Sequence, residues 1–126
     1  MNLVDSSGWL EYFSDGPSAV SFEKALLDNE NLIVPTICLF EVFKVVLRER
    51  GESEALQAIA LMRQAKVVDL TYEIALQAAK ISLEFKIPMA DSIILTTARM
   101  HKATILTMDE DFKDLPAVKY FRKSNP

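Results

Sequence analysis

The stretch NLVDSSGWLEYF, residues 2–13, joins a short apolar run to an amphipathic segment through one acid, Asp5. The apolar run predicts a β-strand over 2–4, and the spacing that follows predicts a helix over 6–13. Asp is a favoured helix N-cap, because its oxygens accept free N–H groups of the first turn. The carboxyl end of a strand is also where open α/β sheets bind ligands. This junction alone therefore leaves both interpretations of Asp5 open.

The rest of the chain repeats this alternation of short apolar runs and longer helical patterns, without an internal repeat or a dividing linker. We expect further strands at 32–35, 66–70, 103–107 and 117–121, and helices at 18–29, 36–50, 53–64, 72–86 and 91–101. Such alternation indicates βαβ crossovers and a sheet covered by helices on both faces. We therefore predict a single α/β domain over residues 1–126, with three layers and a mostly parallel central sheet.

Composition narrows the functional classes. The net charge of −4 argues against a broad, sequence-independent nucleic-acid binder, but not against a nuclease whose metal ions neutralise its acids. The single cysteine, Cys38, excludes an internal disulfide and fits a reducing compartment. The chain shows neither a signal-peptide pattern nor an apolar run long enough for a membrane span, so we expect a cytoplasmic protein without a membrane partner. The basic segment around Lys119, Arg122 and Lys123 is either a solvated end or a phosphate-contacting patch.

The predicted helix over 36–50 is apolar on nearly every side, apart from a narrow stripe formed by Glu41, Lys44 and Arg48. A helix of this kind is expected to be buried nearly all round. In so small a domain, part of that burial would come from a second subunit.

Acidic residues recur where the predicted strands end. Asp5 follows the strand at 2–4, Asp109 follows the strand at 103–107, and Asp91 opens a helix. Glu41 lies one turn into the helix that follows the strand at 32–35. Each has a structural explanation, since the three Asp residues could cap helices and Glu41 could pair with Lys44 three residues away.

A chemical explanation accounts for these acids together. The carboxyl ends of parallel strands share one edge of the sheet, so the four side chains are expected to converge there. Clustered carboxylates repel one another, and hard divalent cations such as Mg²⁺ and Mn²⁺ resolve that conflict because they prefer oxygen ligands. An all-carboxylate site of this type suits phosphodiester hydrolysis.

Other catalytic chemistries find little support in the sequence. The only histidine, His101, follows the end of a predicted helix, and no Gly-x-Ser-x-Gly nucleophile elbow accompanies it. The sequence also has no Gly-rich phosphate loop and no Cys/His zinc spacing. Metal-assisted phosphoester hydrolysis is therefore the catalytic chemistry that the sequence favours.

Three segments, VDSSGWLEYF, IVPTICLFEVFKVV and IPMADSIILTTARMHKATILTMDEDF, resemble the PIN domain, and specifically the VapC-type ribonuclease toxins. The resemblance spans essentially the whole chain. It implies a PIN-like fold and a Mg²⁺- or Mn²⁺-dependent endoribonuclease that hydrolyses RNA phosphodiester bonds with a metal-activated water. It also implies the toxin role in a type II toxin–antitoxin system, a cognate antitoxin whose tail binds near the active site, and a homodimer.

The resemblance assigns roles to individual residues. The catalytic and metal-binding acids of the family fall on Asp5, Glu41, Asp91 and Asp109. The hydroxyls of Ser7 and Thr107 match positions that hold carboxylates or metal-bound water in place, and Asp111 is an additional helper acid. Met108 and Glu110 stand where the family often has basic or polar residues, which puts RNA contacts there in question.

Two alternatives to an active nuclease remain. A catalytically inactive PIN-like module that acts only by binding is the stronger one, and a metal-dependence test would separate it from an enzyme. A receiver domain of two-component signalling would need a pair of acids after the first strand, where the sequence has only Asp5. It would also need an acceptor Asp in a loop, whereas Asp69 lies inside the predicted strand at 66–70.

Overall fold

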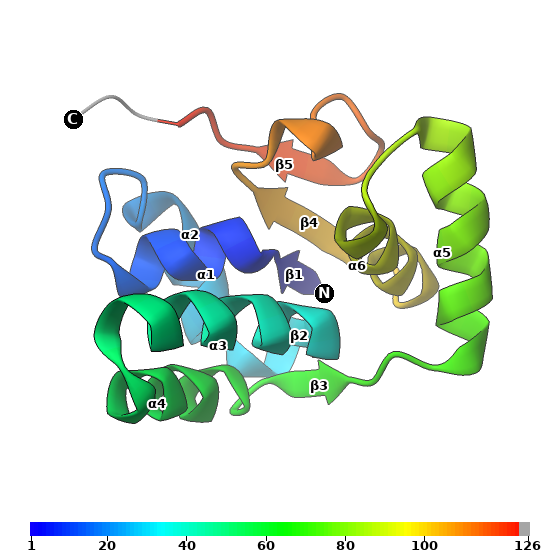
Figure 1. Cartoon of the computed structure of the whole chain (residues 1–126). Helices are drawn as coiled ribbons and strands as arrows, with labels where there is room; N and C mark the ends of the chain where they lie inside the picture. The colour runs from blue at the N-terminus through cyan, green and yellow to red at the C-terminus, as the bar shows by residue number, and fades with distance from the viewer. Residues whose placement is uncertain (124–126) are drawn as a thin grey trace.

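A computed structural model describes residues 1–123 of the chain (Figure 1). The strands are β1 Asn2–Val4, β2 Leu32–Pro35, β3 Lys66–Val68, β4 Thr104–Thr107 and β5 Val118–Tyr120. The helices are α1 Ser6–Phe13, α2 Val20–Leu27, α3 Thr36–Arg50, α4 Glu52–Met62, α5 Tyr72–Phe85 and α6 Met89–Met100, with short 3₁₀ turns η1 Asn29–Asn31 and η2 Glu110–Phe112. Across residues 1–123, no helix combines the length and apolarity needed to cross a membrane.

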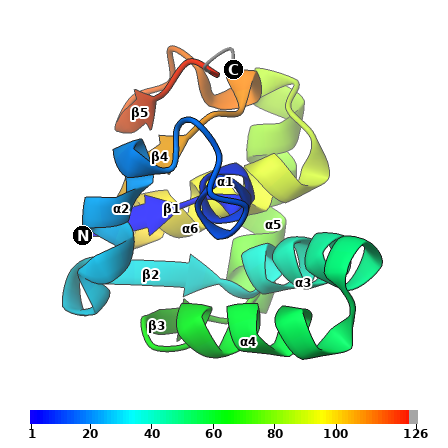
Figure 2. The same ribbon diagram turned by 90° about the vertical axis from the view of Figure 1, so that its left-hand side faces the viewer.

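The five strands form one sheet in the order β3-β2-β1-β4-β5, seen from bottom to top in Figure 2. Every pairing is parallel, and Leu3 of the central strand lies opposite Ile33 of β2 and Ile105 of β4. These three side chains are buried, as expected for a parallel sheet covered by helices. The predicted α/β fold with a parallel central sheet is therefore confirmed.

The order of the strands reverses beside β1. The chain proceeds from β1 to β2 and β3, and then returns through α5 and α6 to β4 on the other side of β1. The carboxyl ends of β1 and β4 meet at this switch point, where Val4 pairs with Leu106 and the Asp5 N–H donates to the Leu106 carbonyl at 3.2 Å. In open α/β sheets such a crevice is the usual ligand site.

The turn from β1 into α1 depends on a close approach at Gly8. A Cβ at this position would lie 2.5 Å from Cγ1 of Val4 and 2.8 Å from the Phe22 ring. Glycine therefore lets the first turn of α1 pack tightly beside β1 and α2, which fixes where the Asp5 junction sits.

The helices predicted over 18–29 and 91–101 have limits in the structure that differ for identifiable reasons. The helix expected over 18–29 is shorter, because Asp28 leaves the helical conformation and its carboxylate accepts a hydrogen bond from the Asn31 amide, a local bond that competes with helix. The helix expected over 91–101 begins two residues earlier, at Met89. Pro88 holds an extended conformation just before it, so Asp91 lies inside the first turn and does not cap the helix.

The all-round burial expected for the helix over 36–50 is not found within one chain. Only Cys38, Val42 and Val46 of α3 are fully buried, and Phe40 is 61% exposed. Lys44 lies over the Phe40 ring at 5.9 Å from its centroid and forms no hydrogen bond or ion pair with Glu41 within the described chain. Because α3 packs mainly against α4 and α1, much of its remaining surface stays open.

Candidate active site

Three carboxylates cluster at the carboxyl end of β4. Asp91, Asp109 and Asp111 each offer one oxygen, and these oxygens all lie within 4.8 Å of one another. Asp91 is buried in the first turn of α6, Asp109 follows β4, and Asp111 lies in η2 at the surface. The Asp109 carboxylate also accepts the Asp111 N–H at 2.9 Å, which fixes the turn that carries both residues.

Asp5 is held at the end of β1 by three hydrogen bonds. One carboxylate oxygen accepts the Ser7 hydroxyl at 2.7 Å and the Gly8 N–H at 3.1 Å, and the other accepts the Thr107 hydroxyl at 2.6 Å. The bond from Gly8 is the helix cap, so the capping interpretation holds at the level of geometry. The side chain is nonetheless 3% exposed, which is unusual for a capping acid and points to a second role.

The same two hydroxyls tie Asp5 to the turn that carries Asp109. The Met108 N–H donates to the Ser7 hydroxyl at 3.0 Å, and the Asp109 N–H donates to the Thr107 hydroxyl at 2.8 Å. Each hydroxyl thus donates to Asp5 and accepts from the backbone after β4. The two strand ends are held together by one continuous hydrogen-bond network.

Burial and mutual repulsion raise the pKa values of two of these acids. Burial raises the pKa of Asp5 to about 6, against the opposing effect of its hydrogen bonds, and the negative charge of Asp109 adds to the rise. Burial also raises the pKa of Asp91 to about 8, with further contributions from Asp109 and Asp111. Both carboxyls are thus costly to ionise where they stand.

The donor set of the cluster fits a hard divalent cation. Three carboxylate oxygens within 4.8 Å of one another match the all-oxygen coordination that Mg²⁺ and Mn²⁺ prefer. A cation there would also offset the repulsion that raises the pKa of Asp91. Asp91, Asp109 and Asp111 are therefore the residues that could hold a metal ion, with Asp5 beside them.

Among the described residues, Glu41 is not part of the cluster formed by Asp91, Asp109 and Asp111. Its carboxylate accepts the Ser6 hydroxyl at 2.6 Å, a bond that joins α3 to the first residue of α1. Burial raises the pKa of the Cys38 thiol, and the charges of Asp5 and Glu41 both add to that rise. Glu41 therefore lies near enough to Asp5 for both to act on one buried group. Ser6 was not anticipated from the sequence, since nothing in its spacing from Glu41 signals the contact.

His101 lies away from these acids. It is the C-cap of α6, whose opposite end carries Asp91, and its Nδ1 is 3.0 Å from the Thr97 carbonyl oxygen. The ring thus has a local structural partner, in agreement with its expected position at a helix end.

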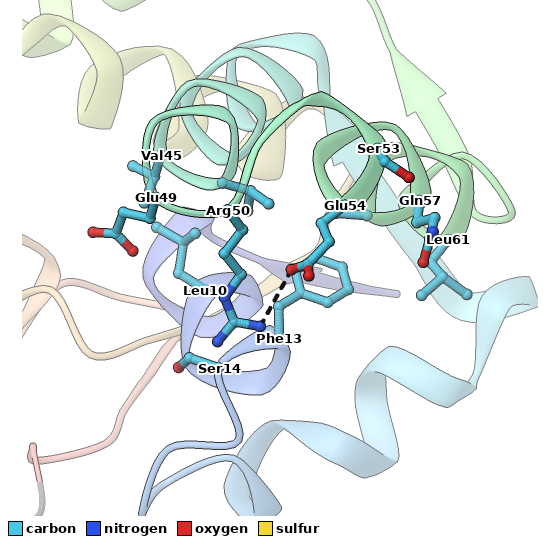
Figure 3. A pocket seen from close by; sticks show the side chains of 12 residues that line it. Leu10, Phe13, Ser14, Val45, Glu49, Arg50, Ser53, Glu54, Gln57 and Leu61 are labelled. Atoms are coloured by element: carbon cyan, nitrogen blue, oxygen red, sulfur yellow. Dashed lines mark ion pairs between the residues drawn. The ribbon is translucent and has the colours of Figure 1, made fainter.

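A separate groove of about 710 Å³ lies between α1, α3 and α4 (Figure 3). Its apolar lining comes from Leu10, Phe13, Val45, Val46, Ala58 and Leu61. Charged and polar side chains also line it, including Arg50 and Glu54, which form an ion pair at 3.5 Å. None of the clustered acids lines this groove, so it is distinct from the acidic site.

The chain is thus an α/β domain with a parallel five-stranded sheet and with carboxylates gathered at the switch point of that sheet. The sequence matches the PIN domain family over residues 3–118, and the chain belongs to that family. No sequence among curated proteins matches it.

Solved structures with the same fold share little sequence with the chain. A toxin–antitoxin complex from Klebsiella pneumoniae is 22% identical with a TM-score of 0.80, covering 94% of this chain and 96% of that one. DNA-bound VapBC from Salmonella typhimurium is 15% identical with a TM-score of 0.76, covering 96% and 98%. VapC20 of Mycobacterium tuberculosis, described as a toxin that cleaves the sarcin–ricin loop, is 18% identical with a TM-score of 0.74 and is covered over 100% of both chains.

Proposed function

We propose that this protein is a metal-dependent endoribonuclease and the toxin of a toxin–antitoxin pair. The observation that carries the proposal is the cluster of Asp91, Asp109 and Asp111 with Asp5 tied beside it, at the switch point of a PIN fold. Structures of the same fold include toxin–antitoxin complexes and a toxin described as cleaving the sarcin–ricin loop, which supports the same assignment.

In this proposal Asp91, Asp109 and Asp111 hold a Mg²⁺ or Mn²⁺ ion, and Asp5 supports it from β1. The bound cation would supply positive charge that activates water and stabilises the charge developing on the scissile phosphate. Asp91 would have to lose its proton to act as a ligand, because its pKa of about 8 favours the neutral form at neutral pH. Ser7 and Thr107 keep the Asp5 carboxylate fixed, so the acid needs no reorientation during turnover.

Glu41 completes the acidic set from α3. Its carboxylate accepts the hydroxyl of Ser6 at 2.6 Å, and Ser6 directly follows Asp5 in the chain. A positioned acid on a separate helix can act on water or substrate without joining the three-carboxylate cluster. We therefore assign Glu41 to catalysis alongside the cluster.

The basic segment after β5 supports a polyanionic substrate. The Phe121 N–H donates to the Thr107 carbonyl at 2.8 Å, so Arg122 and Lys123 follow at the same end of the sheet as Asp109. Cations in that position can contact the RNA backbone on one side of the scissile phosphate. Their placement supports the phosphate-contacting interpretation of this segment.

The groove between α1, α3 and α4 suits the antitoxin partner. An apolar floor with a charged rim is the surface into which the apolar face of an amphipathic segment packs. We expect Leu61→Asp to weaken antitoxin binding in a calorimetric titration while RNA cleavage by the free toxin is unchanged.

The activity is tested by incubating the purified protein with total RNA, with Mn²⁺ or with excess EDTA. Cleavage is expected only with the metal, and Asp91→Asn should abolish it. Asp69→Asn, an exposed acid outside the cluster, is the matched control and should cleave as the parent does. Equal cleavage in EDTA would reject the metal mechanism, and absence of any cleavage with metal would favour a binding-only module.

A further inference from the structure

A second cavity, of about 300 Å³, lies between α2 and the strands β1, β4 and β5. Helix α2 packs mainly against α1 and β1 and lies below β5 in Figure 2. The polar side chains that line the cavity include Lys24, Asp28 and Lys119, and its apolar walls include Leu106 and Phe121. Apolar walls with a few convergent polar groups are typical of small-molecule sites.

The cavity opens on the face of the sheet opposite to the hydroxyl that binds Asp5. In the parallel register of β4 and β5, Leu106 pairs with Lys119 and Thr107 pairs with Tyr120. Successive side chains of a strand point to opposite faces of the sheet. Because the Thr107 hydroxyl donates to Asp5, the side chains of Leu106 and Lys119 point away from the acidic network. None of the clustered acids lines this cavity.

Two cations from distant parts of the chain line the cavity. Lys24 comes from α2 and Lys119 from β5, and both are exposed. Within residues 1–123, neither side chain forms an ion pair, a hydrogen bond or a contact with an aromatic ring. Two ammonium groups beside one cavity repel each other, and an anion between them would replace that repulsion with charge-assisted hydrogen bonds. Lysine commonly supplies such point charges to phosphate groups.

The remaining lining groups suit a ribose and a base. The Phe121 ring is half-buried and is held by an edge contact with the buried Phe22 ring, at 5.1 Å between centroids. Aromatic rings of this kind stack on nucleobases. One oxygen of Asp28 accepts the Asn31 amide at 2.9 Å, and the other can accept a ribose hydroxyl, as acids do in nucleotide sites. A bare phosphate would gain nothing from Phe121 or Asp28.

We propose that this cavity binds a nucleotide, with its phosphate between Lys24 and Lys119, its base against Phe121 and its ribose hydroxyls at Asp28. The nucleotide is free or is one unit of a single-stranded RNA, since both sources carry the same phosphate, ribose and base. The site goes beyond the proposed nuclease function, because binding there requires neither a divalent cation nor cleavage.

The first test titrates the intact protein calorimetrically with AMP and with a short single-stranded oligoadenylate, both in EDTA. EDTA removes divalent cations, so the acidic site cannot hold the phosphate through a metal ion. Both probes are expected to bind the parent and to bind Asp91→Asn equally well. A much lower Kd for the oligoadenylate identifies RNA as the source, and similar Kd values identify the free nucleotide. Absence of binding by both probes, or its loss in Asp91→Asn, overturns the proposal.

Charge reversal tests the phosphate contacts. Lys24→Glu and Lys119→Glu should each raise the Kd of the bound probe by about tenfold or more, at an unchanged melting temperature. Lys119→Arg keeps the charge and should bind nearly as the parent does. Lys80→Glu is the matched control, since Lys80 is exposed on α5 outside the cavity, and it should also bind as the parent does. An equal loss of affinity in Lys80→Glu, or no loss in the two cavity variants, overturns the proposal.

Removal of the ring tests the base contact. Phe121→Leu keeps an apolar side chain against Phe22 but cannot stack on a base, so the Kd of AMP should rise by about tenfold. Inorganic phosphate is the matched probe, because it lacks a base and should bind the parent and Phe121→Leu equally weakly. Inorganic phosphate that binds the parent as tightly as AMP would show an anion site without nucleotide recognition and would overturn the proposal.

Discussion

Replacing Asp5 with Asn separates the capping role of this residue from its place in a charged site. Asn caps a helix about as well as Asp, so a residue that only caps would tolerate the change. The buried carboxylate has a pKa raised from 3.8 to about 6. The folded state therefore holds a proton that the unfolded state has lost, and ionisation costs stability. The cost is absent below about pH 4, grows as pH rises and is complete above about pH 6.

The size of this effect follows from the shift of about two pKa units. At about 1.4 kcal/mol per unit, ionising Asp5 costs about 3 kcal/mol at neutral pH. Asn loses one hydrogen bond that the carboxylate accepts, a cost that is nearly independent of pH. The free energy of unfolding of Asp5→Asn minus that of the parent should therefore increase by about 3 kcal/mol between pH 4 and pH 7. Urea unfolding in EDTA at several pH values measures it. A flat difference, or one that falls with pH as for a carboxylate with a lowered pKa, would refute the reasoning.

Three further changes test the fold and the network around the site. Gly8→Ala should destabilise the metal-free protein by about 1–3 kcal/mol in urea unfolding, since its Cβ would meet Val4 at 2.5 Å. Thr107→Val should cost about 1–3 kcal/mol, because it leaves the Asp5 carboxylate and the Asp109 N–H without the buried hydroxyl. Mn²⁺ should raise the melting temperature of the parent in a thermal scan and should leave that of Asp91→Asn almost unchanged, since only native-state binding stabilises.

The sequence predicts the architecture well because its apolar runs are short and its helices are separated by strong breaks. The strand at 32–35 ends at Pro35. Helix α3 ends just before Gly51, whose φ of 91° suits glycine. Acids just beyond the strand ends could likewise be placed from the pattern alone. Asp5 and Asp109 lie at adjacent strand ends, because the parallel order brings β1 and β4 together.

Contacts between distant segments could not be read from the sequence. The bond from Ser6 to Glu41 spans 35 residues, and the bond from Thr107 to Asp5 spans 102. The start of α6 at Met89 was missed because Asp91 is itself a good capping residue.

The two interpretations of the acid in NLVDSSG therefore describe one residue whose three hydrogen bonds serve two purposes. The Gly8 N–H donates to the Asp5 carboxylate and thereby caps α1. The Ser7 and Thr107 hydroxyls donate to the same carboxylate and connect it to the end of β4. A residue that only caps the helix needs only the bond from Gly8. Its carboxylate would be exposed to solvent, where ionisation does not reduce the stability of the fold. Asp5 is instead buried beside Asp109, which raises its pKa, so that the ionised carboxylate destabilises the fold at neutral pH. This destabilisation is explained if the carboxylate serves to bind a cation, because a bound cation would replace the repulsion among these acids with attraction.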